Sequence, residues 1–161
     1  MLTEIKLASW GEHCASQMRA LGLKPAEKIT YQLNHRAKKR LGLCKKVGNA
    51  YTIEISAFLN EADEKAVETV LYHELLHTCR GCMDHGALWK KYAALLGESL
   101  GLSITRCTKV EGEVGKAFQN YSITCQGCGY VLYRQRKSKV IQNPQWYRCS
   151  HCGGKLLVTK L

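Results

Sequence analysis

Apolar residues recur along the first half of the chain with two different periods, and each period predicts a different element. In residues 7–21 they recur every three or four positions, which places them on one face of a helix that ends at Gly22. In residues 29–33 and 51–56 they alternate with polar residues, as in strands with one buried face. A short strand is also expected near residues 41–43, inside a basic stretch.

The centre of the chain predicts two more helices. One begins near residues 60–63, whose polar side chains suit an N-cap, and the other runs from about residue 87 to 96 and is closed by Gly97. Between them, residues 78–86 are typical of a loop. From residue 121 to 161, short aromatic and β-branched runs flank paired cysteines.

These elements predict an α+β fold in two parts. Residues 1–105 are expected to pack a small mixed or antiparallel sheet against the helices. The strand at 51–56 is expected at the sheet edge, over the cleft, where it could hold an extended peptide. Residues 106–120 show no clear period and are assigned to a linker, and residues 121–161 form a small C-terminal module.

Charge is distributed unevenly between the two parts. Residues 1–105 hold 14 Lys and Arg against 11 Asp and Glu, a net of +3, whereas residues 106–161 hold 10 against 2, a net of +8. A basic C-terminal third favours a polyanionic partner, and nucleic acid is the first candidate.

Hydropathy argues against a membrane protein. No apolar run is long enough for a span, and the N-terminal residues lack the apolar stretch of a secretory signal. We therefore expect a soluble, cytoplasmic protein without a membrane partner, with nucleoid association or a nuclear location as alternatives. In such a compartment the nine cysteines favour metal binding over a disulfide framework.

The expected helix that begins near residues 60–63 carries the sequence His73-Glu74-Leu75-Leu76-His77, an HExxH motif. Residues four apart share a helical face, so His73 and His77 can reach one metal ion. Glu74 is rotated by about 100° from His73, so it can reach a water molecule beside the metal without being a ligand. The motif is typical of zinc enzymes in which the glutamate is the general base. A chance match on a surface helix is the alternative, but the apolar neighbours bury this helix and make unliganded histidines costly.

The third ligand is not fixed by the motif. A catalytic zinc usually takes three protein ligands and leaves one position open. His85, eight positions after His77, and Glu98, 21 positions after it, are both candidates. Cys79 and Cys82 lie in the same loop as His85; they suit a redox function or a second metal, or they are packed, reduced thiols.

The C-terminal module contains two CxxC pairs separated by 20 residues, and a glycine follows each pair. This spacing is typical of a zinc ribbon, whose thiols here are those of Cys125, Cys128, Cys149 and Cys152. A site of four cysteines is closed to substrate, so its zinc ion is expected to be structural.

The segment between the two pairs combines cations with aromatic rings. Cations that contact phosphates and rings that stack on bases are typical of single-strand binding, so single-stranded DNA is the favoured partner. The cations assigned to nucleic-acid binding are Arg134, Arg136, Lys137, Lys139 and Arg148. The aromatic residues, which equally suit the small core of the module, are Tyr130, Tyr133, Trp146 and Tyr147.

The segment LYHELLHTCRGCMDHGALWKKY, residues 71–92, resembles the SprT-like (Spartan-type) metallopeptidase family. Members of that family pair HExxH with a later His-Gly and an aromatic residue three positions on, which here are His85, Gly86 and Trp89. The strand before the motif and the terminal cysteine pairs also match the family order.

The resemblance implies that His85 is the third zinc ligand beside His73 and His77, and that Glu74 is catalytic. It also implies DNA-associated or DNA-crosslinked proteins as substrates. We therefore expect a zinc metalloendopeptidase with one catalytic and one structural zinc ion. The alternative is a nucleic-acid-binding zinc protein whose HExxH site is structural or inactive, although such a site needs no base at Glu74. A metalloenzyme that acts on a non-protein amide is a third hypothesis.

Overall fold

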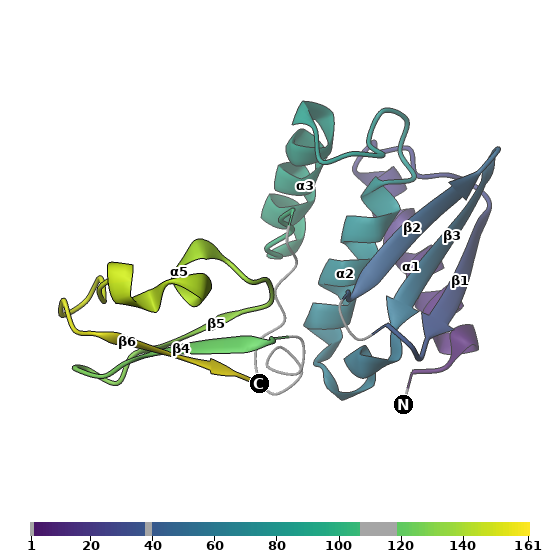
Figure 1. Ribbon diagram of the computed structural model, residues 1–161. Helices are drawn as coiled ribbons and strands as arrows, with labels where there is room; N and C mark the ends of the chain where they lie inside the picture. The colour runs from purple at the N-terminus through teal and green to yellow at the C-terminus, as the bar shows by residue number, and fades with distance from the viewer. Residues whose placement is uncertain (1, 38–39, 107–118) are drawn as a thin grey trace. The chain divides into compact units, whose positions relative to one another are not determined.

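The computed structural model describes residues 2–37, 40–106 and 119–161 and divides into two compact units, residues 1–110 and 111–161. Most of the predicted linker, 106–120, lies outside the described residues. In the first unit, helices α1 and α2 lie on one face of a three-stranded sheet (Figure 1). The elements of this unit are α1 (Glu4–Ala20), β1 (Ile29–Asn34), β2 (Gly42–Val47), β3 (Ala50–Ser56), the 3₁₀ turn η1 (Ala57–Glu61), α2 (Glu64–Leu76) and α3 (Ala87–Leu100).

The sheet of the first unit is mixed, in the order β1-β3-β2. β1 pairs with β3 in parallel, and β2 pairs with β3 in antiparallel register. The prediction that residues 51–56 form the edge strand is therefore wrong, because β3 is central and β2 is an edge. Alternation shows which face of a strand is buried but not which strands lie beside it, and that order depends on long-range pairing.

The helix-facing side of the sheet forms the core of the first unit. Ile53 and Ile55 of β3 are completely buried there, beside Tyr31 of β1. On α1, Gly11 makes room for this layer, because a Cβ at that position would lie 2.2 Å from the ring of Tyr31. The lack of a side chain at Gly11 thus lets the helix backbone approach the sheet closely.

Helix α3 runs four residues beyond its predicted end. Gly97 lies inside it, and the left-handed residue that ends it is Gly101, with φ 63°. A Cβ at Gly97 would lie 2.7 Å from the carbonyl oxygen of Leu102. Gly97 is therefore not a cap; its missing side chain lets the chain turn back against the helix.

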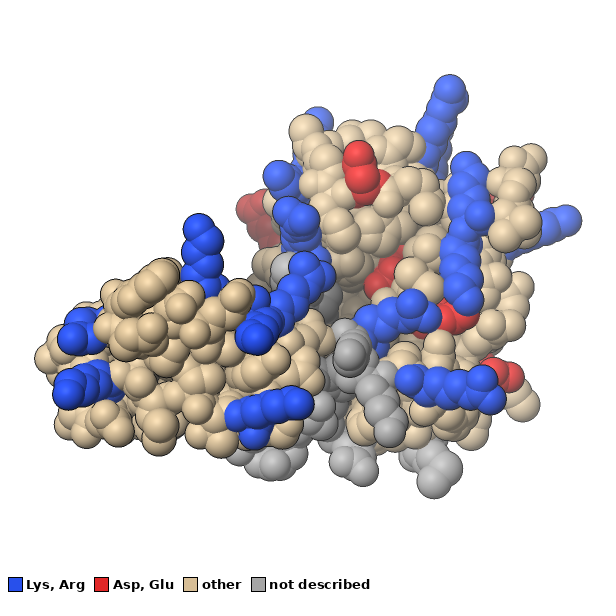
Figure 2. Space-filling model, in the orientation of Figure 1, with Lys and Arg blue, Asp and Glu red and all other residues tan. Residues whose placement is uncertain are grey.

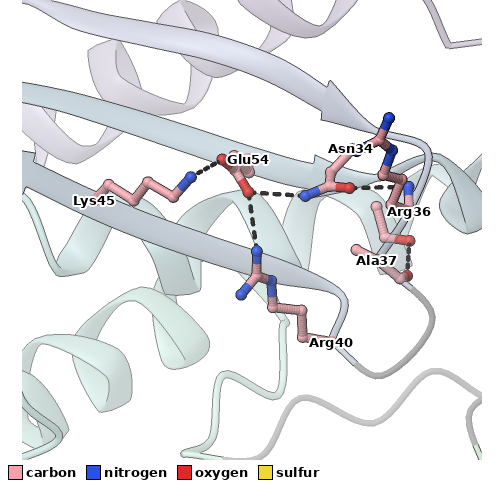
Figure 3. Close-up of polar contacts among 7 residues, drawn as sticks. Asn34, Arg36, Ala37, Arg40, Lys45 and Glu54 are labelled. Carbon is pink, nitrogen blue, oxygen red and sulfur yellow. Dashed lines mark hydrogen bonds and ion pairs between the residues drawn. The ribbon is translucent and has the colours of Figure 1, made fainter.

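The other face of the sheet carries a buried carboxylate. Glu54 of β3 accepts hydrogen bonds from Lys45, from Arg40 at 3.1 Å and from the Asn34 amide at 2.9 Å, as Figure 3 shows. Its side chain is 10% exposed. The hydrogen bond from Lys45 lowers the pKa of Glu54, against the opposing effect of burial. This cluster ties edge strand β2 and the segment before it to the centre of the sheet.

The second unit holds an antiparallel sheet in the order β5-β4-β6. Its elements are β4 (Tyr121–Cys125), β5 (Val131–Arg134), α5 (Lys139–Gln142), the 3₁₀ turn η2 (Pro144–Trp146) and β6 (Leu156–Lys160). The α+β fold predicted from the sequence is confirmed. Among the described helices of both units, none combines the length and apolar composition that a bilayer crossing requires.

Candidate metal centre and cysteine cluster

Helix α2 positions the HExxH motif at its C-terminal end. The helix begins at the N-cap Asp63, whose side chain accepts a hydrogen bond from the backbone N–H of Ala66. Its last residues are almost entirely buried, so His73 and Glu74 lie in the interior between α2 and its neighbours. His77 is the C-cap and still has helical backbone angles, so it stays one turn from His73.

Three histidines converge at this point. One ring nitrogen from each of His73, His77 and His85 lies within 4.8 Å of the others. The Nε2 atoms of His73 and His85 are 3.0 Å apart. Two nitrogen ligands of a single tetrahedral zinc ion lie about 3.3 Å apart, so this spacing fits a shared metal.

Backbone carbonyls orient two of the three rings. Nδ1 of His73 lies 3.0 Å from the carbonyl oxygen of Thr105, and Nδ1 of His77 lies 2.7 Å from that of Cys82. A carbonyl oxygen only accepts, so each Nδ1 carries the proton and donates it. Nε2 is then the atom through which each of these two rings could bind a metal.

The histidines are held in the neutral form that a metal ligand needs. Burial, followed by the charges of the neighbouring His77 and His85, lowers the pKa of His73 to about 4, against the opposing effect of the hydrogen bond to Thr105. Burial also lowers the pKa of His77, although its hydrogen bond to Cys82 acts in the opposite direction. At neutral pH the cluster therefore presents unprotonated ring nitrogens to a cation.

Trp89 of α3 closes one side of the cluster. Its ring centroid lies 4.9 Å from that of His73, 5.8 Å from His77 and 4.6 Å from His85. The indole is 2% exposed. Contact with all three imidazoles restricts the orientation of each ring and excludes water from this side.

Glu74 lies outside the ligand cluster and faces β2. A Cβ at Gly42 would lie 2.6 Å from Oε1 of Glu74, so the carboxylate occupies space that this glycine leaves empty. The backbone of Cys44 forms a hydrogen bond with the carboxylate. Burial raises the pKa of Glu74 to about 7, although the Cys44 hydrogen bond and Arg40 lower it. A carboxylate in this range can accept and return a proton near neutral pH.

The other candidates near the motif lie apart from the three histidines. Glu98 is an exposed residue near the end of α3 and is not part of the cluster. Cys79 and Cys82 are buried, and burial raises the pKa of the Cys79 thiol to about 11. Cys82 contacts the histidine cluster through its backbone carbonyl, which accepts from His77.

The second unit gathers the four ribbon cysteines, Cys125, Cys128, Cys149 and Cys152, which lie within 4.8 Å of one another by their sulfur atoms. The two CxxC segments have the same turn. The N–H of Gly129 donates to the Cys125 carbonyl, and that of Gly153 to the Cys149 carbonyl, and both glycines have φ near 70°, at 72° and 71°. These left-handed positions require glycine and aim each thiol pair at one point. The cluster fits a zinc ribbon.

Backbone groups of the cysteine cluster are placed where they can stabilise thiolate sulfur. Backbone N–H groups point at the thiols: Gly127 donates to Sγ of Cys125 at 3.3 Å and His151 to Sγ of Cys149 at 3.4 Å. Backbone hydrogen bonds, that of Cys128 first, lower the pKa of Cys125 to about 6. A hydrogen bond from the Gly154 backbone also lowers the pKa of Cys152. Hydrogen bonds with the neighbouring thiols have the larger combined effect, and the pKa of Cys152 rises to about 12. A bound cation would favour the thiolate form of Cys152.

The five cations assigned to nucleic-acid binding are all exposed on the second unit. Arg134 ends β5, Lys139 begins α5, and Arg148 donates to the carbonyls of Gln145 and Tyr147. Residues 119–161 contain no Asp or Glu, and the face of this unit in Figure 2 shows blue side chains without red. Trp146 is 75% exposed, whereas His151 packs its ring on Tyr130 at 4.3 Å.

Sequence reasoning missed the groups that support the site. Thr105 and Cys82 act through backbone carbonyls, which every residue type has, so no motif reveals them. Gly42 and Cys44 contact Glu74 from another element. A glycine inside an expected strand was the available signal, because it often marks a close approach of another group.

Comparison with known proteins places the chain in a family. None of the curated proteins compared with this chain matches it. The model of the SprT-like family matches residues 11–108, more than half of the chain, and this range includes the three clustered histidines, Glu74 and Trp89. This protein belongs to the SprT-like family.

Proposed function

We propose that the protein is a zinc-dependent peptidase in which His73, His77 and His85 hold the metal and Glu74 is the general base. The observation that carries the proposal is the position of Glu74. Its carboxylate is buried beside three converging histidines, yet it is not a member of the ligand cluster. A purely structural metal site has no use for such a group, whereas a hydrolytic one requires it.

The metal, Glu74 and the residues around the histidines have separate roles in the proposed reaction. Bound zinc would polarise the peptide carbonyl and make a water molecule more acidic. Glu74, with its pKa raised to about 7, accepts the proton of the attacking water and returns it to the leaving amine. Trp89 and the carbonyls of Thr105 and Cys82 keep the histidine rings in place.

The edge strand β2 is the surface that suits a peptide substrate. Among the described residues it is paired on one side only, with β3. The Cys44 backbone forms a hydrogen bond with Glu74, so the unpaired edge lies along the metal centre. An extended peptide that adds to this edge places its backbone beside Glu74. β2 thus takes the role first expected for residues 51–56.

A panel of substrates tests the proposal against its rivals. Full-length protein, stripped of metal by a chelator and reloaded with zinc, is incubated with casein, histones and small non-protein amides. We expect cleavage of the proteins only after zinc is returned. Cleavage of small amides alone would favour a different amidohydrolase, and zinc binding without any hydrolysis would favour the structural or inactive alternative.

We further propose that the second unit holds a structural zinc ion and contacts DNA, and that the substrates are DNA-associated proteins. The support is its carboxylate-free described surface and the exposed rings and cations. The family resemblance supplies the substrate class.

Salt-dependent DNA binding tests this second part. Changing Arg136 and Lys137 together to Ala should reduce affinity for a single-stranded oligonucleotide and lower the slope of log affinity against log salt by about 0.7 per lost contact. The matched control changes Lys155 and Lys160 on the same unit. Binding that survives the first change and falls when Arg36 is changed would place the contact on the first unit instead.

A further inference from the structure

A cavity of about 330 Å³ lies in the first unit, next to the segment that follows α2. Lys46 of edge strand β2 lines it, together with Thr78, which directly follows the candidate ligand His77. Residues two apart on a strand face the same side, so Lys46 lies on the side of Cys44, about 7 Å further along β2. The cavity is therefore one strand repeat away from the point where β2 contacts Glu74.

The lining of this cavity is strongly cationic. Lys24, Lys46 and Arg80 contribute three positive charges, and the described residues that line it include no Asp or Glu. The remaining lining residues include the neutral polar side chains of Asn49 and Tyr51. Like charges repel one another, so an anion that enters the cavity reduces the repulsion among these three cations and also forms contacts with them.

Hydrogen bonds shape one wall of the cavity, whereas its three cationic side chains are exposed. The Ala26 N–H donates to the Thr78 hydroxyl at 3.1 Å, and that hydroxyl donates to the Leu75 carbonyl at 2.7 Å. These bonds fix the segment that carries Lys24 against the end of α2. On the opposite side, the Lys46 ammonium lies 5.3 Å from the centre of the Tyr51 ring.

We propose that the cavity lined by Lys24, Lys46 and Arg80 is a specificity subsite for an aspartate or glutamate side chain of the substrate. The inference rests on the proposed peptidase function, since it takes the bound peptide to lie along β2. Every second side chain of such a peptide faces the same side, so one of them reaches the cavity about two residues from the bond beside Glu74. A peptide carboxylate is favoured over a nucleic-acid phosphate because Lys46, one of the lining residues, lies on β2, the strand that contacts Glu74.

Cleavage-site mapping tests the subsite. The zinc-loaded full-length protein is incubated with a randomised peptide pool, and the cuts are mapped by mass spectrometry. We expect Asp and Glu to be enriched at one fixed position relative to the cut. In the double variant Lys46→Ala, Arg80→Ala, kcat/KM for a matched glutamate peptide should fall about three- to tenfold, while that for its glutamine counterpart stays unchanged. Lys65→Ala, at the other end of α2, removes an exposed cation outside the cavity and should behave as wild type.

Each outcome decides the inference separately from the peptidase proposal. Glu74-dependent cleavage without acidic preference, or with a preference that the double variant keeps, overturns the subsite and leaves the peptidase standing. If no peptide is cleaved, the peptidase proposal fails, and anisotropy with labelled glutamate and glutamine pools decides the cavity alone. Equal binding of the two pools contradicts a peptide carboxylate site. So does a double variant that loses affinity for a single-stranded oligonucleotide but keeps its affinity for the glutamate pool.

Discussion

Gly42 on β2 and Glu74 on α2 lie so close that a Cβ at Gly42 would meet Oε1 of Glu74 at 2.6 Å. The edge strand therefore determines where the carboxylate can lie. The three nearest atoms all belong to the Glu74 side chain and not to the backbone, so we expect a larger residue at position 42 to displace the proposed base rather than prevent folding.

The first prediction concerns this contact. Gly42→Ala should lower kcat/KM by about 100-fold, because a displacement of about 1 Å at a catalytic group has an effect of this size. Circular dichroism and zinc content should stay as in wild type. Leu43→Ala is the matched control, since Leu43 is the next residue of β2 and faces the other side of the sheet. Wild-type activity in Gly42→Ala would show that the contact does not position Glu74.

The second prediction concerns Trp89, which contacts all three imidazoles. Trp89→Phe should weaken zinc binding at the histidine cluster by roughly 10- to 100-fold, as loss of outer-shell support does. Competition with a chelating dye measures the affinity. Trp10→Phe is the control, because the Trp10 indole instead donates to Glu68, at 3.2 Å. Equal affinity in the two variants would mean that Trp89 is only a packing residue.

The third prediction separates the two metal clusters. Changing Cys125 and Cys149 to Ser should remove one of two zinc ions per chain and unfold the second unit, since binding energy in so small a module is largely folding energy. The histidine cluster lies in the other unit and should keep its zinc. Metal analysis together with NMR of the amide signals checks both points. A single zinc ion in untreated wild-type protein would contradict the prediction.

The fourth prediction concerns pH and the buried carboxylate Glu54. Its pKa is lowered, so its stabilising effect is fully present above the usual value near 4.5 and is lost as pH falls through the lower folded-state pKa. Glu54→Gln should reduce the free energy of unfolding by about 1–3 kcal/mol at pH 7, with a shrinking difference below pH 4.5. Urea unfolding between about pH 3 and 7 measures this. A difference that does not change with pH would assign the effect to packing instead.

The sequence predicted those parts of the site that follow from local periodicity. His73 and His77 could be assigned because a helix brings residues four apart to one face. His85 could not be chosen over Glu98 from spacing alone, since a loop has no period; the family resemblance favoured it, and the structure brings it to the cluster.

The rest of the site depends on contacts between distant segments. The position of β2 at the sheet edge follows from pairing with β3, and neither strand's own pattern contains that information. Gly42 lies in a basic stretch whose charges drew attention to nucleic acid rather than to Glu74. The Thr105 carbonyl is contributed by a segment 32 residues after His73, and no side-chain chemistry marks it.

The most direct test of the catalytic role of the histidine cluster is the zinc content and proteolytic activity of Glu74→Gln, measured on the same preparation. Glutamine keeps the size of the side chain but cannot take a proton, and residue 74 is not among the three clustered histidines that could hold a metal. We predict two zinc ions per chain, as in wild type, and a loss of casein cleavage of about 100- to 10,000-fold. A Glu74→Gln protein that keeps its zinc and still cleaves casein at the wild-type rate would contradict the assignment of Glu74 as the general base.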